Sequence, residues 1–137
     1  MSAQRIEGAV ALVTGANRGI GRALTEALLT RGARKVYAAA RNPEALRDLR
    51  DERLVPLRLD VTDAEQIRAA GEAASDVELV FNNAGVALPG GIADSTVLDR
   101  ARREMEVNYF GPLQLLHQLA PTLARNCLLY TSDAADE

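Results

Sequence analysis

Residues 10–21 read VALVTGANRGIG, a short apolar run that continues into three closely spaced glycines. Val10–Thr14 has the composition of a β-strand, and Gly19–Arg31 repeats apolar residues at helical spacing, so the glycines lie between a strand and a helix. Glycine allows a sharp turn and the close approach of a phosphate, and the first N–H groups of the helix favour an anion. The pattern predicts a phosphate-binding turn; the alternative is a tight strand–helix turn that binds nothing.

The rest of the chain repeats this alternation of strand and helix. Strands joined through helices favour a parallel sheet with helices on both faces, and apolar runs are typical of strands covered on both sides. Asn42-Pro43-Glu44 resembles a helix start, and Thr62–Glu65 matches a capping box. We therefore predict an α/β fold with a doubly wound parallel sheet. The further expected elements are strands at Lys35–Ala40, Leu54–Leu59 and Val77–Phe81, a helix from Thr62 to about Ala74, and a long helical pattern from Asp94 or Ser95 to about Ala124, interrupted at Pro112 and Pro121.

Composition excludes several classes of protein. The chain has 137 residues, 47% hydrophobic and 26% charged, which is the balance of one globular domain. No apolar run reaches the roughly 18 residues of a membrane span, and Met1–Gly8 lacks the apolar core of a secretory signal, so we expect a cytoplasmic protein with no membrane partner. A net charge of −3 argues against a nucleic-acid partner. Cys127 is the only cysteine, which excludes a disulfide framework and a cysteine-based zinc site, and we predict no metal site.

The end of the second strand indicates which dinucleotide the turn would bind. In dinucleotide-binding folds an acid about 20 residues past the glycines binds the adenosine ribose of NAD, whereas an arginine accommodates the 2′-phosphate of NADP. Residues 38–41 read AAAR, without an acid, and Arg18 in the glycine turn could reach the same phosphate. Two guanidiniums can bind a phosphate dianion through several N–H donors. Arg18 and Arg41 therefore favour NADP(H) over NAD(H), unless both are solvated surface residues.

Polar and small residues follow the third and fourth strands at the same edge. Asp60-Val61 ends the third strand, and the Asp60 carboxylate could accept a hydrogen bond from an adenine amino group; the alternative is a helix-capping acid. Asn82-Asn83-Ala84-Gly85 ends the fourth strand. Two amides can tie neighbouring strands together, and two small residues let a ligand lie against the backbone. The alternative is a polar turn, which explains the small pair less well.

Together these motifs resemble the short-chain dehydrogenase/reductase family. The residues that carry the resemblance are Thr14-Gly15-x3-Gly19-x-Gly21, Asp60-Val61, Asn82-Asn83-Ala84-Gly85 and Val107-Asn108, in family order, and it covers Gly8 to about Arg125. The resemblance implies a Rossmann-type fold with the cofactor across the carboxyl ends of the strands. The cofactor-binding residues that it implies are Gly15, Asn17, Arg18, Gly19, Ile20, Gly21, Arg41, Asp60, Val61, Asn83, Ala84 and Gly85.

The resemblance also implies a reaction and one catalytic residue. In this family a substrate carbonyl takes hydride from the nicotinamide and a proton from a tyrosine, assisted by a lysine and a serine, and an asparagine holds a water in the proton relay. Asn108 matches that asparagine. On helical spacing Asn108 shares a face with Ala101, Met105, Leu115 and Leu119, so we expect a buried amide whose polar atoms are satisfied by neighbouring backbone.

The tyrosine and lysine of the family are missing from the printed sequence. Their Tyr-x3-Lys spacing occurs nowhere, because Tyr37, Tyr109 and Tyr130 are followed four residues on by arginine, leucine and alanine, and Lys35 is the only lysine. The last eleven residues, Cys127–Glu137, fit one reading frame of a transposase-type sequencing adapter. We therefore expect residues 1–125 to be the N-terminal part of a Rossmann domain, truncated after about four strands, and residues 126–137 to be a non-native tail.

Three functions compete on the sequence. The first is the N-terminal fragment of an NADP(H)-dependent oxidoreductase of carbonyl or alcohol substrates, itself inactive, from a parent that the resemblance implies is a homo-oligomer. The second is a dinucleotide-binding module without chemistry. The third is another nucleotide-binding α/β enzyme such as a methyltransferase, which Asn82–Gly85 and Asn108 argue against. Because four strands leave an apolar sheet edge and helix face uncovered, we expect the chain to be poorly soluble or partly unfolded alone.

Overall fold

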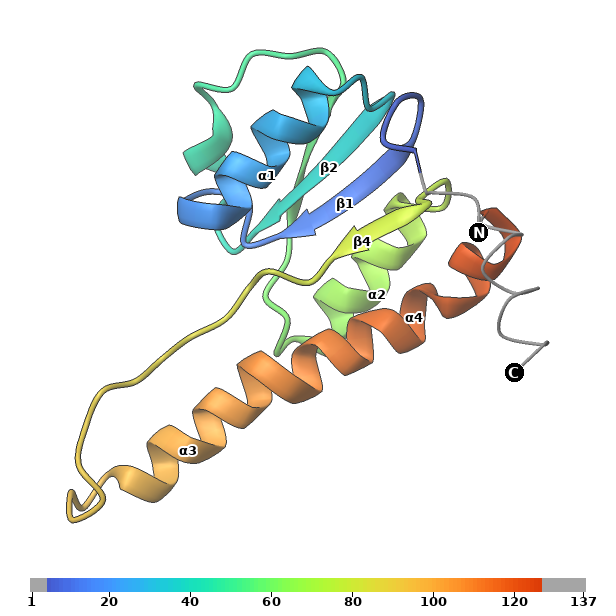
Figure 1. Cartoon of the computed structure of the whole chain (residues 1–137). Coiled ribbons are helices and arrows are strands. Elements are labelled where there is room, and N and C mark those ends of the chain that lie inside the picture. The colour runs from blue at the N-terminus through green and yellow to red at the C-terminus, as the bar shows by residue number, and fades with distance from the viewer. Residues whose placement is uncertain (1–4, 127–137) are drawn as a thin grey trace.

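The computed structural model describes residues 5–126, and it has a four-stranded parallel sheet in the order β3-β2-β1-β4. Helices lie on both faces of this sheet (Figure 1), as the sequence predicts for a Rossmann-type fold. The strands are β1 (Val10–Thr14), β2 (Lys35–Ala40), β3 (Leu54–Arg58) and β4 (Leu79–Phe81). The helical elements are α1 (Gly19–Thr30), the 3-10 turn η1 (Pro43–Leu46), α2 (Ala64–Ala73), α3 (Val97–Met105), the π-helical turn η2 (Glu106–Phe110) and α4 (Gly111–Asn126).

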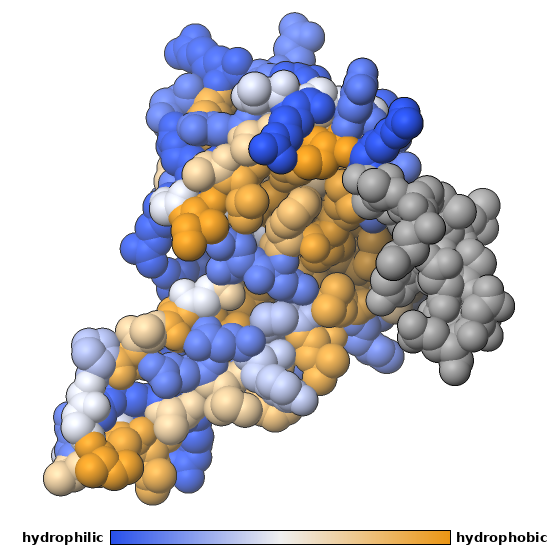
Figure 2. Space-filling model, viewed as in Figure 1, coloured by the Kyte–Doolittle hydropathy of each residue, from blue (hydrophilic) through white to orange (hydrophobic). Residues whose placement is uncertain are grey.

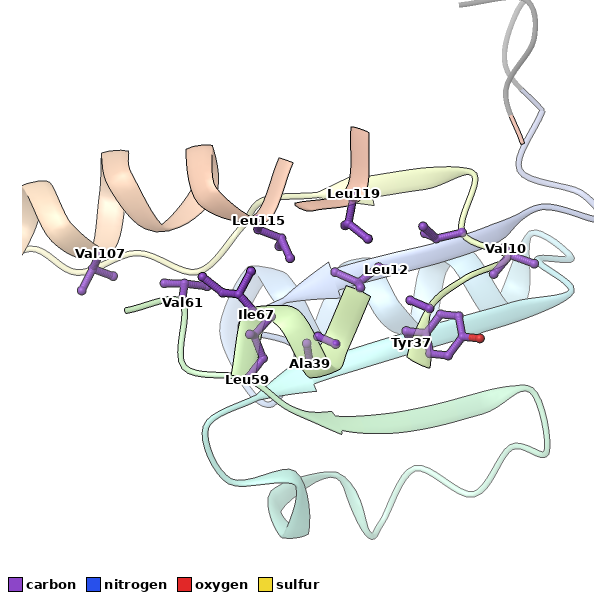
Figure 3. Close-up of a cluster of buried hydrophobic side chains, with 13 residues drawn as sticks. Val10, Leu12, Tyr37, Ala39, Leu59, Val61, Ile67, Val107, Leu115 and Leu119 are labelled. Atoms are coloured by element: carbon purple, nitrogen blue, oxygen red, sulfur yellow. The ribbon is translucent and has the colours of Figure 1, made fainter. Parts of the chain in front are cut away.

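Strand β1 lies inside the sheet and supplies side chains to two separate cores. Val10 and Leu12 point into a cluster that α2 and α4 cover, where Leu115 and Leu119 are fully buried (Figure 3). The intervening Ala11 and Val13 belong to a second cluster, under α1 and η1. Successive strand residues point to opposite faces, so an unbroken apolar run is what a strand between two helical layers requires.

One expected helix start is confirmed and another is displaced. Asn42 caps the helical segment that follows it, with Pro43 in the first position, but the segment is one 3-10 turn, whose Leu46 is buried, instead of an α-helix. The capping box at Thr62 is displaced by one residue. Asp63 is the cap of α2 and accepts from the N–H groups of Glu65 (3.0 Å) and Gln66 (3.2 Å).

The long helix is broken at a place that the sequence does not mark. The chain passes through η2 between α3 and α4, whereas Pro112 and Pro121 both lie within α4. A π turn adds one residue to the helical repeat, so Val107 instead of Asn108 faces the core. No residue of α3 is buried, and α3 extends away from the sheet (Figure 1). The expected fourth strand is also shorter, because Val77 closes a turn onto the carbonyl of Ala74 before β4 begins at Leu79.

An uncovered apolar surface is present, as the sequence predicts. Edge strand β4 is only half-buried along its whole length, and Figure 2 shows apolar side chains gathered on this face of the molecule. Exposed large apolar residues of α3, η2 and α4 are Leu98, Met105, Tyr109, Phe110, Leu113 and Leu116. No helix within residues 5–126 is long and apolar enough to cross a membrane, and this part of the chain holds no metal-ligand cluster. Of the expected non-native tail, residues 126–137, Asn126 is the last residue of α4, and Cys127–Glu137 lie outside the described residues.

Candidate functional site

A cleft of about 660 Å³ opens at the carboxyl ends of the strands. It collects every residue that the sequence predicts to bind a cofactor, except Gly21. The lining residues are Gly15, Asn17, Arg18, Gly19, Ile20, Ala40, Arg41, Asn42, Leu59, Asp60, Val61, Asn83, Ala84, Gly85, Val86, Arg103 and Val107. In open α/β sheets this edge is where ligands bind.

The glycine turn of the cleft contains backbone conformations that are strained for residues with a Cβ atom. Gly15 and Gly19 have φ angles of +64° and +55°, in the left-handed region where a Cβ is strained. Gly21 is buried, and a Cβ there would overlap the carbonyl oxygen of Gly15 and Nδ2 of Asn83. Gly21 therefore does not line the cleft, and instead lets α1 pack closely against the turn.

The start of α1 faces the cleft with its first N–H groups uncapped. Arg18 is the N-cap residue, its backbone is extended, and its side chain makes no capping hydrogen bond. The first turn of α1 also lacks an acidic residue. Uncapped N–H groups and the positive end of the helix dipole together form a site suited to an anion.

Thr14 and Asn83 join the ends of β1 and β4 beneath the cleft. The buried Thr14 hydroxyl accepts from the N–H groups of Asn83 (3.0 Å) and Ala84 (2.9 Å) and donates to the carbonyl of Phe81 (3.4 Å). Nδ2 of Asn83 donates to the carbonyls of Thr14 (3.1 Å) and Gly15 (3.4 Å). These contacts show that Asn83 ties the two strands together, while the small residues that follow it line the cleft.

Asp60 lies two residues after β3, where hydrogen bonds and nearby charges favour its ionised form. Its Oδ1 accepts from the hydroxyl (2.7 Å) and the N–H (2.9 Å) of Thr62. These two bonds, together with the positive charges of Arg103 and Arg41, lower the pKa of Asp60 despite partial burial. Because Asp63 caps α2, the alternative that Asp60 is a helix cap is wrong.

Arg18 and Arg41 both line the cleft, with exposed side chains, and sequence reasoning missed a third arginine. Arg103 reaches the cleft from α3. Nothing in its local pattern marks it, because α3 carries several arginines and only the tertiary position of the helix selects one. The other missed lining residues are Ala40, Asn42, Leu59, Val86 and Val107.

Asn108 lies beside the cleft and is held by two hydrogen bonds to one residue. Its Oδ1 accepts from the N–H of Val86 (2.8 Å), and its Nδ2 donates to the carbonyl of Val86 (2.7 Å). The expectation that backbone groups satisfy this amide is confirmed. The expectation of burial is wrong, since Asn108, Ala101 and Met105 are exposed. Only the residues of the expected helix face that lie in α4 are buried. The reason is that the π turn changes which residues face the core and that α3 extends away from the sheet.

Two further side chains continue this contact along the helix. Oε1 of Glu104 accepts from the N–H of Leu88 (2.6 Å), and Arg100 donates to the carbonyls of Pro89 (3.1 Å) and Gly91 (3.2 Å). Arg100, Glu104 and Asn108 are spaced four residues apart, so they lie on one side of the helix. They fix the extended segment after β4, residues 84–91, next to the cleft.

Comparison with known proteins agrees with this architecture. The family model of the short chain dehydrogenases matches residues 9–127. The chain belongs to the short-chain dehydrogenase family. Short-chain dehydrogenase PC-15 of Penicillium crustosum is 36% identical over 135 residues, which cover 92% of this chain and 49% of that relative.

Solved structures of the family superpose on the chain. A short chain dehydrogenase from Burkholderia cenocepacia J2315 in complex with NADP is 47% identical, has a TM-score of 0.84, and the match covers 90% of this chain and 52% of that one. The 3-ketoacyl-(acyl-carrier-protein) reductase of Brucella melitensis complexed with NADH is 26% identical, with a TM-score of 0.80 and coverages of 88% and 52%. The chain thus spans about half the length of these family members.

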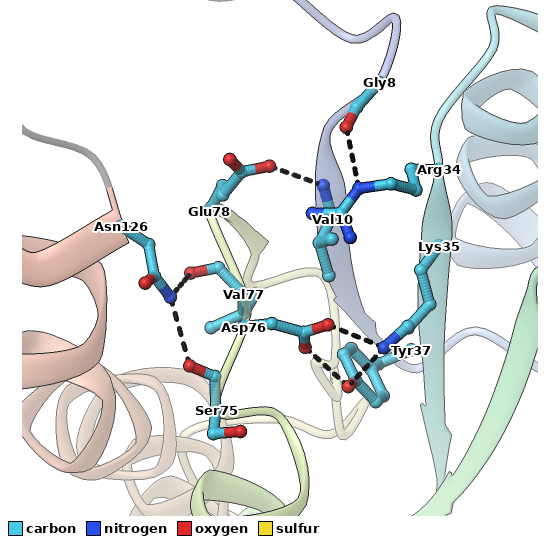
Figure 4. Close-up of polar contacts among 10 residues, drawn as sticks. All are labelled: Gly8, Val10, Arg34, Lys35, Tyr37, Ser75, Asp76, Val77, Glu78 and Asn126. Carbon is cyan, nitrogen blue, oxygen red and sulfur yellow. Dashed lines mark hydrogen bonds and ion pairs between the residues drawn. The ribbon is translucent and has the colours of Figure 1, made fainter.

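Lys35, the only lysine of the chain, lies at the amino end of β2, away from the cleft. Its Nζ forms an ion pair with Oδ2 of Asp76 (2.6 Å) and donates to the hydroxyl of Tyr37 (3.3 Å), which in turn donates to Asp76 (2.6 Å), as Figure 4 shows. The hydrogen bond that Lys35 donates to the Asp76 carboxylate raises the pKa of Lys35, so its ammonium is stabilised. Lys35 therefore has a structural position, unlike a lysine that assists chemistry at a cofactor.

Proposed function

We propose that the cleft binds a nicotinamide dinucleotide and that the chain is the cofactor-binding half of an oxidoreductase. The reaction is hydride transfer between NADP(H) and a carbonyl or alcohol substrate. The observation that carries the proposal is the convergence of the uncapped start of α1, the glycine turn and Asp60 in one cleft at the carboxyl edge of the sheet. When bound, the nicotinamide supplies or accepts the hydride.

Different groups of the cleft bind different parts of the cofactor. The N–H groups at the start of α1 bind the pyrophosphate, and the Asp60 carboxylate accepts a hydrogen bond from the adenine amino group. Ala84 and Gly85 leave space for the cofactor next to the backbone. Asn108 holds the segment at Val86 beside the reacting end, where the family places its proton-relay asparagine.

Preference for NADP(H) rests on Arg18 and Arg41. Both guanidiniums line the cleft, and the end of β2 carries no acid that would bind a ribose 2′-hydroxyl or repel a phosphate. The relative from Burkholderia cenocepacia binds NADP, whereas the one from Brucella melitensis binds NADH, so family membership alone does not decide between the two cofactors.

Titration calorimetry of the chain with NADPH and NADH tests this proposal. The expected result is tighter binding of NADPH, with the preference reduced at least tenfold in Arg41→Ala and in Arg18→Ala, since each change removes a charged contact to the phosphate. Arg31→Ala is the matched control, because Arg31 is exposed at the far end of α1. Equal affinities for the two cofactors would contradict the preference, and no binding of either by a chain that circular dichroism shows to be folded would contradict the function.

The whole enzyme requires residues beyond those printed. We propose that the parent continues past residue 125 into the family's serine and Tyr-x3-Lys, that the chain alone does not oxidise NADPH, and that Cys127–Glu137 is not native. The coverage of about half of each relative supports this. Sequencing the source DNA across codon 125 decides the matter. A frame that continues supports the oxidoreductase, and a genomic stop after Glu137 supports the alternative of a dinucleotide-binding module without chemistry.

We further propose that the parent is a cytoplasmic homo-oligomer. The exposed apolar side chains along α3 and α4 support assembly, because a surface of this kind is typical of a protein interface. Light scattering of the parent tests the proposed oligomeric state, and a monomer would contradict it.

A further inference from the structure

Arg103 lines the cleft from α3, an element that places no residue in the core. It belongs to α3, none of whose residues is buried, yet it borders the same cleft as Asp60 and Val61. The other two arginines of the cleft come from the glycine turn and the end of β2. Arg103 therefore reaches the cleft from a different structural element than Arg18 and Arg41 do.

The neighbours of Arg103 on α3 have partners that Arg103 lacks. Arg100 pairs with Asp94 (2.9 Å) and Arg102 pairs with Asp99 (3.4 Å). Within residues 5–126, the guanidinium of Arg103 forms neither an ion pair nor a hydrogen bond, and the same holds for Arg18 and Arg41. The N–H donors of all three cleft arginines are thus available to a ligand.

The packing of the long helix places Arg103 near the end of β3. Val107, four residues after Arg103, belongs to the buried cluster that contains Val61. Four residues further on, a Cβ on Gly111 would lie 2.7 Å from Cγ2 of Val61. The positive charges of Arg103 and Arg41 also contribute to the lowered pKa of Asp60, after the two bonds from Thr62. The proposed function places the adenine at this carboxylate. A planar guanidinium is suited to lie against an aromatic ring, by stacking and by cation–π attraction.

We propose that Arg103 is a binding residue for the adenine end of the cofactor, with its guanidinium against the base and beside the Asp60 carboxylate. This inference rests on the proposed function. It assigns α3 a direct part in cofactor binding. Because the adenine is common to both dinucleotides, Arg103 contributes equally to NADPH and NADH, in contrast to Arg18 and Arg41, which contact the 2′-phosphate of NADPH alone.

Calorimetric titration of Arg103→Ala, Arg103→Lys and Arg102→Ala with NADPH and with NADH tests the inference. Arg103→Ala is expected to weaken both cofactors by the same factor, about three- to tenfold. Arg103→Lys is expected to recover only part of the loss, since lysine keeps the charge but not the planar surface. Arg102→Ala is the control. Arg102 directly precedes Arg103 and is exposed, but its side chain pairs with Asp99 and does not line the cleft.

The outcomes separate the inference from the function on which it rests. Unchanged affinity in Arg103→Ala, while the unaltered chain binds both cofactors, would overturn the inference and leave the proposed function in place. A loss confined to NADPH would also overturn it, because it would place Arg103 at the 2′-phosphate. Failure of the unaltered chain, shown by circular dichroism to be folded, to bind either cofactor would overturn the proposed function and the inference with it.

Discussion

The two ends of the parallel sheet contain similar polar residues but use them differently. At the amino end, Lys35, Tyr37 and Asp76 form a closed set of hydrogen bonds, and the Glu78 carboxylate accepts from the N–H of Val10 (2.8 Å) (Figure 4). Here the charged groups find partners within the fold. The amino end thus contributes to stability and has little capacity left for a ligand.

At the carboxyl end the same kinds of group remain open. Arg18, Arg41 and Arg103 line one cleft without an ion pair among the described residues, and the first N–H groups of α1 have no side-chain cap. Buried polar groups normally find partners in the folded chain. The three arginine side chains are exposed, so water satisfies their donors until a ligand displaces it. The paired groups at the amino end therefore stabilise the fold, whereas the donors at the carboxyl end are available for binding.

The largest expected effect is at the base of the cleft, in Gly21→Ala. The new Cβ would overlap backbone at Gly15, which cannot move aside as a flexible side chain could, so we expect a loss of about 3 kcal/mol in the free energy of unfolding. The urea midpoint measures it. Gly91→Ala is the matched control, because a Cβ there meets nothing within 4 Å. Equal midpoints for the two variants would contradict the close packing of α1 on the turn.

Thr14→Val is expected to cost about 2 kcal/mol of unfolding free energy and to weaken NADPH binding. The change keeps the shape of the side chain but leaves the N–H groups of Asn83 and Ala84 without their acceptor. Thr30→Val serves as the control, since the exposed Thr30 hydroxyl donates only to a carbonyl of its own helix, and it should change stability by less than about 0.5 kcal/mol. Similar losses in both variants would show that Thr14 does not tie β1 to β4.

A smaller effect is expected at the amino end, in Asp76→Asn. Loss of the carboxylate weakens the bonds to Lys35 and Tyr37, at a half-exposed site, and should lower the unfolding free energy by about 1 kcal/mol. NADPH affinity should not change. A weakened NADPH affinity would contradict the conclusion that the amino end of the sheet takes no part in cofactor binding. Asp99→Asn, at an exposed pair, should be nearly neutral.

The smallest expected effect is a pH dependence of the stabilisation that the bonds of Asp76 to Lys35 and Tyr37 provide. Burial raises the pKa of Asp76, but the bonds from Lys35 and Tyr37 outweigh it and lower the pKa below its usual 3.8. The stabilisation is therefore present above about pH 4 and is lost as the pH falls through the lowered folded-state value. The difference in unfolding free energy between the unaltered chain and Asp76→Asn should shrink from about pH 6 to about pH 3. A difference that stays constant would show that the charge of Asp76 is not involved.

The parts of the structure that could be predicted from the sequence are those set by local pattern. The apolar run of β1 and the glycines after it specify a strand, a turn and a helix within about 20 residues of chain, so this side of the cleft could be predicted. The displacement of the α2 cap to Asp63 could not, because Thr62 and Asp63 are both good cap residues and only the fold decides between them.

The features that escaped prediction depend on contacts between distant segments. The π turn η2 brings Gly111 against Val61, where a Cβ on Gly111 would lie 2.7 Å from Cγ2 of Val61, and this packing sets which residues of the long helix face the core. Arg103 reaches the cleft only because α3 is placed there by η2. Helical periodicity therefore misplaced Asn108 and gave no sign of Arg103.

Amide hydrogen exchange with and without NADPH tests the central claim, that the open end of the sheet binds the dinucleotide and the closed end does not. Saturating NADPH is expected to slow exchange at Gly15–Gly21 and Asn83–Val86, while exchange at residues 75–78 stays the same. Slowed exchange centred on residues 75–78, or no change anywhere, would contradict it.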